Sequence, residues 1–187
     1  MRNPHQTVDV FIALLRGINL GGHKTIRMEQ LRACFEGLGF RKVRTYVQSG
    51  NVVFEAQKEL TTRLSEKIGK CILSEFGFPV STVVRSAQEM EQVVRGNPFV
   101  KQRGIDTSKL HITFLSGPAP KAAARELAPL AADLEQFHLK DREIYLYCPN
   151  GYGRTKLSNN AIEKKLGFEA TTRNWKSVNA LLALARE

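Results

Sequence analysis

Residues 42–56 constrain the fold most, because they read as two short strands joined by a tight turn. The segment "KVRTYVQ" alternates apolar or β-branched residues with polar ones, and "NVVFEA" is a second short strand. Gly50 and Asn51 stand between the two strands and tolerate a positive φ, which is typical of hairpin turns. The two strands are therefore expected to pair antiparallel, which disfavours a largely parallel sheet.

The elements around this hairpin follow the order β-α-β-β-α-β within residues 8–86. A buried strand, "VDVFIALL", precedes an amphipathic helix, "MEQLRACFEGLGF". After the hairpin come a helix, "LTTRLSEKIGKCILSEFGF", that ends near Gly77, a strand, "PVSTVVRS", and a short helix, "AQEMEQVVRG". This is the order of a ferredoxin-like, split β-α-β sheet. In such a sheet the third strand lies between the first two and runs antiparallel to both.

The second half of the chain repeats most of this order without obvious residue identity. It has a strand, "LHITFLSG", a helix, "PKAAARELAPL", interrupted near Pro129, and a hairpin that turns near residues 140–142. A short helix, "NNAIEKKLG", follows, with an expected capping box from Asn160 to Glu163 and Gly167 at its end. The segment "TRNWKSVNALLALARE" is expected to be a closing helix in place of a clear last strand.

We therefore predict an α+β protein of two ferredoxin-like βαββα(β) halves with mainly antiparallel sheets and a C-terminal helix. The first half covers residues 1–96 and the second covers residues 110–187. Residues 97–109 form the expected linker, since they are polar and contain Pro98 and Gly104.

The charge of the chain is positive and unevenly distributed. There are 28 Lys and Arg residues against 18 Asp and Glu residues, which gives a formal net charge of +10. No acidic residue occurs between Asp9 and Glu29, between Glu36 and Glu55, or over residues 146–162. These acid-free stretches coincide with the glycine-rich loops, which favours an anionic partner, whereas the alternative is a soluble protein that is simply basic.

Several classes of protein are disfavoured by composition. The chain has an odd number of cysteines, Cys34, Cys71 and Cys148, and none of them forms a CxxC motif. This argues against a disulfide framework or a zinc site and fits a reducing cytoplasm. The first residues do not resemble a signal peptide, and no apolar run approaches the length of a membrane span. Cys148 is either a nucleophile or a packed thiol. No cofactor and no metal are expected, because the four histidines lack ligand spacing: His5, His23, His111 and His138.

The segment "RGINLGGHKTIRM", residues 16–28, resembles a phosphate-binding P-loop at first sight. Gly17 and Gly22 have the separation of the pattern G-x-x-x-x-G-K-[ST]. His23, however, intervenes before Lys24, and one extra residue rotates the lysine away from the phosphate nest. The hairpin at Gly50 also conflicts with the sheet that a P-loop needs. We therefore do not expect a nucleoside triphosphatase.

Topology nevertheless places this loop beside the hairpin turn. In a split β-α-β sheet, the loop after the first strand and the turn between the second and third strands lie at the same end. The residues expected to meet there are Arg16, Asn19, Gly21, Gly22 and Lys24 from the loop and Gln48, Ser49 and Asn51 from the turn. Such a group can bind a phosphate, a carboxylate or a nucleic-acid backbone. The alternative is a glycine-permitted turn in which Asn19 caps its own backbone.

A second group of this kind lies in "CPNGYGRTKLSNNAIEKK". Its residues stand just before a helix N-terminus, where an anion would meet backbone donors and two cations. Tyr152 can stack on a base, and so can Trp175 further on. The alternative is a loop with solvated cations and a helix cap at Ser158 or Asn160. The candidate ligand-binding residues of this group are Asn150, Tyr152, Arg154 and Lys156, with Gly151 and Gly153 between them.

Two long segments and two short ones resemble one bacterial family, the domain of unknown function 1697. They are "ALLRGINLGGHKTIRMEQLRACFEGLGFRKVRTYVQSGNVVFE", "LHITFL" with the preceding "NPF", and "YLYCPNGYGRTKLSNNAIEKKLGFEATTRNWKSV". The resemblance covers nearly the whole chain and implies a cytoplasmic bacterial protein with two related α/β halves, but no function. Its motif residues correspond to Arg16, Gly17, Asn19, Gly21, Gly22, Gln48, Ser49, Gly50, Asn51, Asn150, Gly151, Tyr152, Arg154, Lys156, Arg173, Asn174 and Trp175. This chain has Arg27 where many members carry a proline.

Three hypotheses for function follow. The first is a binding module for a phosphate-bearing ligand or nucleic acid. The second is an enzyme acting on a small anionic substrate, with Arg16, Lys24, Arg154 and Lys156 as electrostatic clamps; no catalytic residue is identified, since no G-x-S-x-G elbow or carboxylate pair occurs. The third is a structural or interaction protein in which these motifs determine the fold. The oligomeric state is left open.

Overall fold

A computed structural model describes residues 7–22 and 24–187. His5 and His23 therefore lie outside the described residues. The chain divides into two compact units, which we describe separately: residues 1–91 with 181–187 form the first unit, and residues 92–180 form the second. The boundary between them falls within helix α3 (Ala87–Arg95) and again within helix α6 (Trp175–Ala185).

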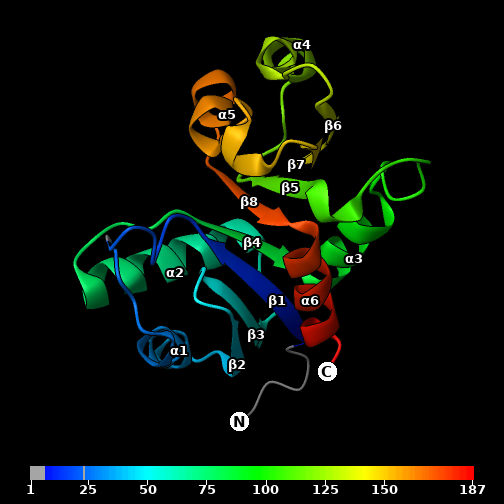
Figure 1. Cartoon of the computed structure of the whole chain (residues 1–187). Coiled ribbons are helices and arrows are strands. Elements are labelled where there is room, and N and C mark those ends of the chain that lie inside the picture. The colour runs from blue at the N-terminus through cyan, green and yellow to red at the C-terminus, as the bar shows by residue number, and fades with distance from the viewer. Residues whose placement is uncertain (1–6, 23) are drawn as a thin grey trace. The chain divides into compact units, whose positions relative to one another are not determined.

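The first unit contains a four-stranded antiparallel sheet of order β2-β3-β1-β4 (Figure 1). Its elements are β1 (Val8–Leu15), α1 (Met28–Gly37), β2 (Arg41–Tyr46), β3 (Asn51–Gln57), α2 (Thr61–Phe76) and β4 (Thr82–Ser86). β3 lies between β1 and β2 and is antiparallel to both, as expected for a ferredoxin-like sheet. The expected end of α2 is also confirmed, because Gly77 closes it with φ of 77°.

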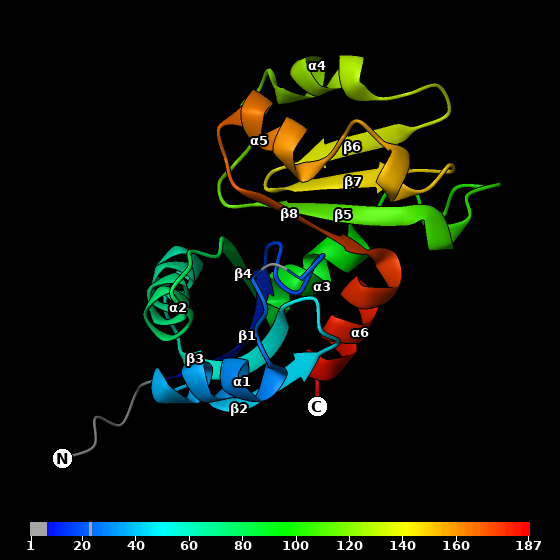
Figure 2. The same cartoon turned by 60° about the vertical axis from the view of Figure 1, so that its left-hand side comes forward.

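One face of this sheet packs on α1 and α2 through a core rich in phenylalanine. Alternate residues of β1 and β3 point to this face, and Phe11 stacks on Phe54 with 5.8 Å between ring centroids. Phe35 of α1 meets Phe54 edge to face at 5.3 Å, and Phe40 stacks on Phe54 at 4.6 Å. Figure 2 shows both helices on this side of the sheet.

The cysteines differ from the expectation. Cys34 of α1 and Cys71 of α2 form a disulfide, and Cys148 is the free, buried cysteine of the second unit. The expectation that the odd count disfavours disulfides was wrong for this pair, because the two residues lie 37 positions apart and meet only when both helices pack on the same sheet face.

The second unit repeats the topology with a sheet of order β6-β7-β5-β8 (Figure 2). Its elements are a 3₁₀ turn (Thr107–Lys109), β5 (Leu110–Leu115), α4 (Ala123–Leu127), a 3₁₀ turn (Ala128–Leu130), β6 (Gln136–Lys140), β7 (Glu143–Tyr147), a 3₁₀ turn (Tyr152–Arg154), α5 (Asn159–Leu166) and β8 (Ala170–Asn174). α4 and α5 cover the sheet face that carries Ile144, Leu146 and Leu115.

Two expectations about the second half were wrong. Residues 170–174 form a strand, β8, paired with β5, so the closing helix α6 begins at Trp175 and not at Thr172. α5 is capped by Ser158, whose hydroxyl accepts a hydrogen bond from the Ala161 amide at 3.4 Å. The capping box from Asn160 is therefore absent at this helix start, and Glu163 accepts instead from the Ala170 amide at 2.8 Å.

Candidate anion-binding site

The loop after β1 lies against the β2–β3 turn, as the topology predicted. Asn19 makes the connection: its amide nitrogen donates to the carbonyl oxygens of Gln48, at 2.9 Å, and Ile26, at 3.0 Å. Its side-chain oxygen accepts from the Ile26 amide at 2.8 Å. Since both amide hydrogens and the oxygen are used inside the protein, Asn19 holds the loop in shape, as the alternative interpretation of this residue proposed.

A pocket of about 480 Å³ lies where the loop, the turn and the start of α1 meet. Arg27, the residue before α1, is exposed, and Arg32, one turn into the helix, is half-buried. The Arg32 guanidinium donates to the Thr45 hydroxyl at 3.4 Å, which holds it toward β2. The described residues that line the pocket are Asn19, Gly22, Thr25, Ile26, Arg27, Met28, Glu29, Arg32 and Gln48.

The electrostatic character of this pocket is mostly positive. Two guanidinium groups line it, and the first turn of α1 presents backbone N–H groups that no side chain caps at Arg27. Glu29 is the carboxylate among the described lining residues. The stretch that is free of acids in sequence therefore ends at a residue that itself lies on the pocket wall.

Three predicted residues line the pocket, namely Asn19, Gly22 and Gln48. The structure gives the others different contacts. The Lys24 ammonium donates to the Pro79 carbonyl at 2.9 Å, and the Asn51 amide donates to the Tyr46 carbonyl and the Ser49 hydroxyl within the turn.

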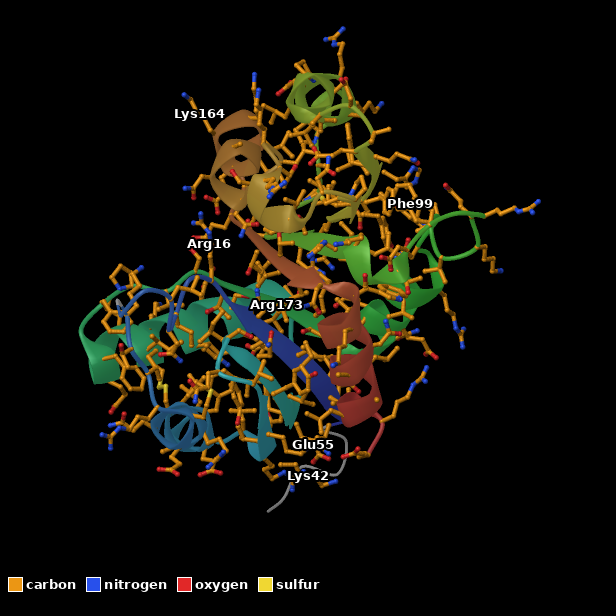
Figure 3. All side chains as sticks on the ribbon, viewed as in Figure 1. Arg16, Lys42, Glu55, Phe99, Lys164 and Arg173 are labelled. Carbon is orange, nitrogen blue, oxygen red and sulfur yellow. A yellow bond between two sulfur atoms is a disulfide. The ribbon has the colours of Figure 1, made fainter. Side chains whose placement is uncertain are left out.

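Two of the remaining predicted residues belong to the backbone of the loop. The Arg16 amide donates to the Ser81 carbonyl at 2.8 Å, which fixes the exit of β1 (Figure 3). Gly21 has φ of 59° in the turn itself. Sequence reasoning did not name Thr25, Arg27 or Arg32 as lining residues. Thr25 and Arg27 lie within the loop segment that it considered, whereas Arg32 lies one turn into α1. The spacing of Arg32 from the helix start was the available signal.

A second pocket, of about 610 Å³, lies at the opposite end of the same sheet, where β1 begins and α2 and α3 start. It is lined by Asp9, Glu59 and Glu89 together with Lys58. Glu59 pairs with Lys67 at 2.7 Å, and Glu89 closes a capping box with Ser86. Because carboxylates dominate this pocket, it is a poor site for an anion.

In the second unit, Tyr152 anchors its loop to the sheet. Its hydroxyl donates to the Thr172 hydroxyl at 2.9 Å, and its ring stacks on His111 with 4.9 Å between ring centroids. The Thr172 hydroxyl also contacts Thr113 and Asn159, each at 2.7 Å. Tyr152 therefore has a structural role that the sequence did not reveal. The other members of this group, Asn150, Arg154 and Lys156, are exposed.

The 150–156 loop is less positive in space than in sequence. The Thr155 hydroxyl donates to a Glu135 carboxylate oxygen at 2.9 Å, so an acid from outside the loop lies against it.

Burial lowers the pKa of His111, which keeps the ring neutral at neutral pH. Burial raises the pKa of Cys148 to about 11, which disfavours the thiolate that a nucleophile would need.

Arg173 and Trp175 both make contacts within the protein. Arg173 of β8 is buried, and its guanidinium donates to the Thr171 hydroxyl at 2.8 Å and the Thr172 carbonyl at 2.9 Å (Figure 3). Burial lowers the pKa of Arg173 to about 10, so the group still carries its charge at neutral pH. Trp175 is half-buried at the first position of α6, and its carbonyl accepts from Asn179 at 2.8 Å.

Within the described ranges, no group of three or more His, Cys, Asp or Glu residues is arranged to hold a metal ion. A helix long and apolar enough to span a membrane is also absent from the part of the chain that the structure describes.

Comparison with known proteins agrees with this architecture. A family model for proteins of unknown function, DUF1697, matches residues 8–145. The chain belongs to the DUF1697 family. The structure of the conserved bacterial protein SP0830 from Streptococcus pneumoniae aligns with this chain with a TM-score of 0.76 at 21% identity, over 96% of this chain and 99% of that chain. That likeness shows the fold alone. The comparison with curated proteins gives no match.

Proposed function

We propose that this DUF1697 protein binds a phosphate-bearing ligand in the pocket formed by Asn19, Gly22 and residues 25–27 of the loop, the β2–β3 turn and the start of α1. The observation that carries the proposal is the pair Arg27 and Arg32 on the wall of a pocket of about 480 Å³. Guanidinium groups form strong, charge-assisted hydrogen bonds with phosphate oxygens, and free N–H groups at a helix start add to them. The formal net charge of +10 adds long-range attraction for anions.

The pocket also has the size and polarity of a small-molecule site. Its volume lies in the range of about 300–1,000 Å³ that is usual for such sites. Gln48 and Thr25 add neutral hydrogen-bonding groups beside the two arginines, and the Gly22 backbone faces the same space. The loop at residues 150–156 is a weaker candidate, because Glu135 lies against it.

The test is calorimetric titration of the whole protein with inorganic tripolyphosphate at low salt. Arg27→Ala and Arg32→Ala should each weaken binding about tenfold or more, since a hydrogen bond to a charged group contributes about 1.5–3 kcal/mol. Affinity should fall steeply as salt is added. An oligonucleotide is titrated in parallel. If the same pocket binds a nucleic-acid backbone, the affinity for the oligonucleotide should also fall steeply as salt is added.

Arg63→Ala is the matched control. Arg63 is an exposed arginine of α2 outside the described pocket lining, so its removal lowers the net charge by the same amount. If Arg63→Ala weakened binding as much as Arg27→Ala, the effect would be one of net charge and the pocket would have no special role. Undisturbed binding in the Arg27→Ala/Arg32→Ala double variant would refute the proposal and favour the structural interpretation of these motifs.

A further inference from the structure

We infer that the ligand of this pocket is a phosphorylated sugar or polyol, whose phosphate binds the two arginines and whose hydroxyl groups donate to Glu29. This inference rests on the proposed function and names the class of ligand. The Glu29 carboxylate lines the pocket together with Arg27 and Arg32. A carboxylate on the wall of an anion site repels the anion, and it becomes favourable where the ligand also offers hydrogen-bond donors.

The charged side chains of this pocket do not neutralise one another. Among the residues that the structure describes, no ion pair joins Glu29 to Arg27 or Arg32. The Arg32 guanidinium donates instead to the Thr45 hydroxyl at 3.4 Å. A guanidinium binds phosphate oxygens through several N–H groups, whereas an ionised carboxylate only accepts hydrogen bonds. The pocket therefore presents donors for a phosphate and an acceptor for hydroxyl groups at the same time.

Two neutral polar side chains of the lining extend this pattern. Thr25 and Gln48 line the pocket and are exposed, and neither side chain is hydrogen-bonded to a residue that the structure describes. A hydroxyl and an amide group each donate and accept, as sugar hydroxyls do. Small-molecule sites generally use a few such polar groups to fix the orientation of the ligand, and a volume of about 480 Å³ leaves room for a carbon skeleton beside the phosphate.

The lining is poorly suited to a nucleobase. No aromatic ring occurs among the described residues that line the pocket. Its aliphatic members are Ile26, which is 2% exposed, and Met28, which is half-buried. Since bases bind to proteins mainly by stacking on aromatic rings, we expect the hydroxyl groups of the ligand to add affinity and a base to add none.

The experiment compares ribose-5-phosphate with pentyl phosphate, which have equally many carbon atoms and a single phosphate group each but differ in their hydroxyl groups. Each is titrated calorimetrically into the whole protein at one low ionic strength. Ribose-5-phosphate should bind about tenfold tighter, because its hydroxyl groups donate to a charged acceptor. Adenosine monophosphate, which adds a base to the same ribose phosphate, should bind no tighter than ribose-5-phosphate.

Glu29→Ala should change the two affinities in opposite directions. Pentyl phosphate should bind about threefold tighter, because a repulsive charge is removed. Ribose-5-phosphate should bind about threefold weaker, because the loss of the hydroxyl acceptor outweighs that gain. Opposite changes of this kind do not arise from a folding defect. Glu36→Ala, which removes an exposed carboxylate near the other end of α1, is the matched control and should leave both affinities unaltered.

The alternative role of Glu29 is structural, because an acidic residue in the first turn stabilises a helix through its dipole. That role alone would make Glu29→Ala change both affinities alike, which would overturn this inference. Equal affinities of the unaltered protein for the two ligands, or no measurable binding of either, would overturn it as well. Tighter binding of adenosine monophosphate would overturn it in favour of a nucleotide. In all these cases, binding of tripolyphosphate leaves the proposed function standing, whereas failure of tripolyphosphate to bind overturns both.

Discussion

The end of the first strand is held in the same way in both units. In the first unit, the Leu15 amide donates to the Gly50 carbonyl at 2.8 Å. In the second unit, the Leu115 amide donates to the Arg142 carbonyl at 2.9 Å. The two hydrogen bonds join equivalent strands at equivalent places, so the repeated topology extends to individual backbone contacts.

A buried arginine occupies the fourth strand of each sheet. Arg85 of β4 lies opposite Ile12, and Arg173 of β8 lies opposite Ile112. Each guanidinium donates to the carbonyl of the residue before it, at 3.0 Å for Arg85 and 2.9 Å for Arg173. The two units therefore share a buried side chain that is costly to place in the interior without hydrogen bonds.

The units differ in where their polar side chains gather. In the first unit one polar group lies at the end of β1, where Asn19 bonds the loop to Gln48 beside a pocket, and another lies where β1 begins. In the second unit they gather at the opposite end of the sheet, where Tyr152 and His111 stack over Thr172. Shared backbone bonds thus hold the sheets in the same way, whereas the loops of the two units differ in their polar contacts.

The largest effect on stability is expected from a substitution at Gly50. The equivalent position in the second unit is Arg142, which has a side chain. A Cβ atom on Gly50 would lie 2.7 Å from the Leu15 Cβ, and its φ of 74° favours glycine. Gly50→Ala should therefore lower the free energy of unfolding by about 3–4 kcal/mol, as strain and overpacking add. Urea unfolding followed by circular dichroism measures the loss.

Arg142→Ala is the control at the equivalent position. Arg142→Ala should lower the free energy of unfolding by less than about 1 kcal/mol, because the turn of the second unit already accommodates a side chain at this position. Trp175, the one tryptophan of the chain, lies in the second unit, and its fluorescence is followed alongside circular dichroism. If Gly50→Ala proved as mild as Arg142→Ala, the comparison of the two turns would fail.

The next largest effect is expected at the disulfide, which has no counterpart among the described residues of the second unit. Cys71→Ser should destabilise the first unit by about 3 kcal/mol, because the bond closes a loop between residues 37 positions apart. Denaturant unfolding with and without a thiol reductant measures this, and the Trp175 signal should not move.

Counting thiols tests the same bond directly. Protein unfolded without reductant should expose one thiol, that of Cys148, and the reduced protein should expose three. Cys148→Ser should leave the effect of the reductant unaltered. Three free thiols in protein isolated without reductant would contradict the disulfide.

A smaller effect is expected at Tyr152, the anchor of the second unit. Tyr152→Phe removes the hydrogen bond to Thr172 and keeps the stacking on His111, so it should cost about 1 kcal/mol. The Trp175 transition measures the loss, and binding of tripolyphosphate should be unchanged. A large loss of binding with little loss of stability would move the site to the second unit.

Most of the fold was predictable because alternation and turn chemistry are local. The hairpin at Gly50 and the order of elements in the first unit were confirmed. β8 was missed because Arg173 points into the interior where the apolar alternation of a strand is expected. Its guanidinium donates to Thr171 and Thr172 of the same strand, and a pattern of apolar residues does not show such contacts.

The candidate site was predictable only in its location. Topology correctly placed the loop of Asn19 beside Gln48. It could not show that Asn19 and Lys24 bond to the protein itself, or that Arg27 and Arg32 line the pocket. The bonds of Asn19 and Lys24 depend on segments that are distant in sequence, such as the chain at Gln48 and Pro79, which the loop sequence does not show.

The smallest effects are expected from substitutions of two carboxylates, Glu29 on the wall of the pocket in the first unit and Glu135 beside the loop at residues 150–156. Glu29 lies on the pocket wall and is exposed, whereas Glu135 accepts a hydrogen bond from Thr155 at 2.9 Å. Glu29→Gln should strengthen tripolyphosphate binding about threefold, because it removes repulsion worth less than about 1 kcal/mol. Calorimetric titration measures the change.

Two matched variants separate an effect on ligand affinity from an effect on stability. Glu135→Gln should weaken the second unit without altering binding, since that carboxylate holds its loop. Glu36→Gln, near the other end of α1, should change neither quantity appreciably. Tighter binding from Glu135→Gln, with none from Glu29→Gln, would show that the anion sits at the end of the sheet where Tyr152 lies. Tighter binding from Glu29→Gln alone supports the pocket at the end of β1, because Glu29 lines that pocket together with Arg27 and Arg32.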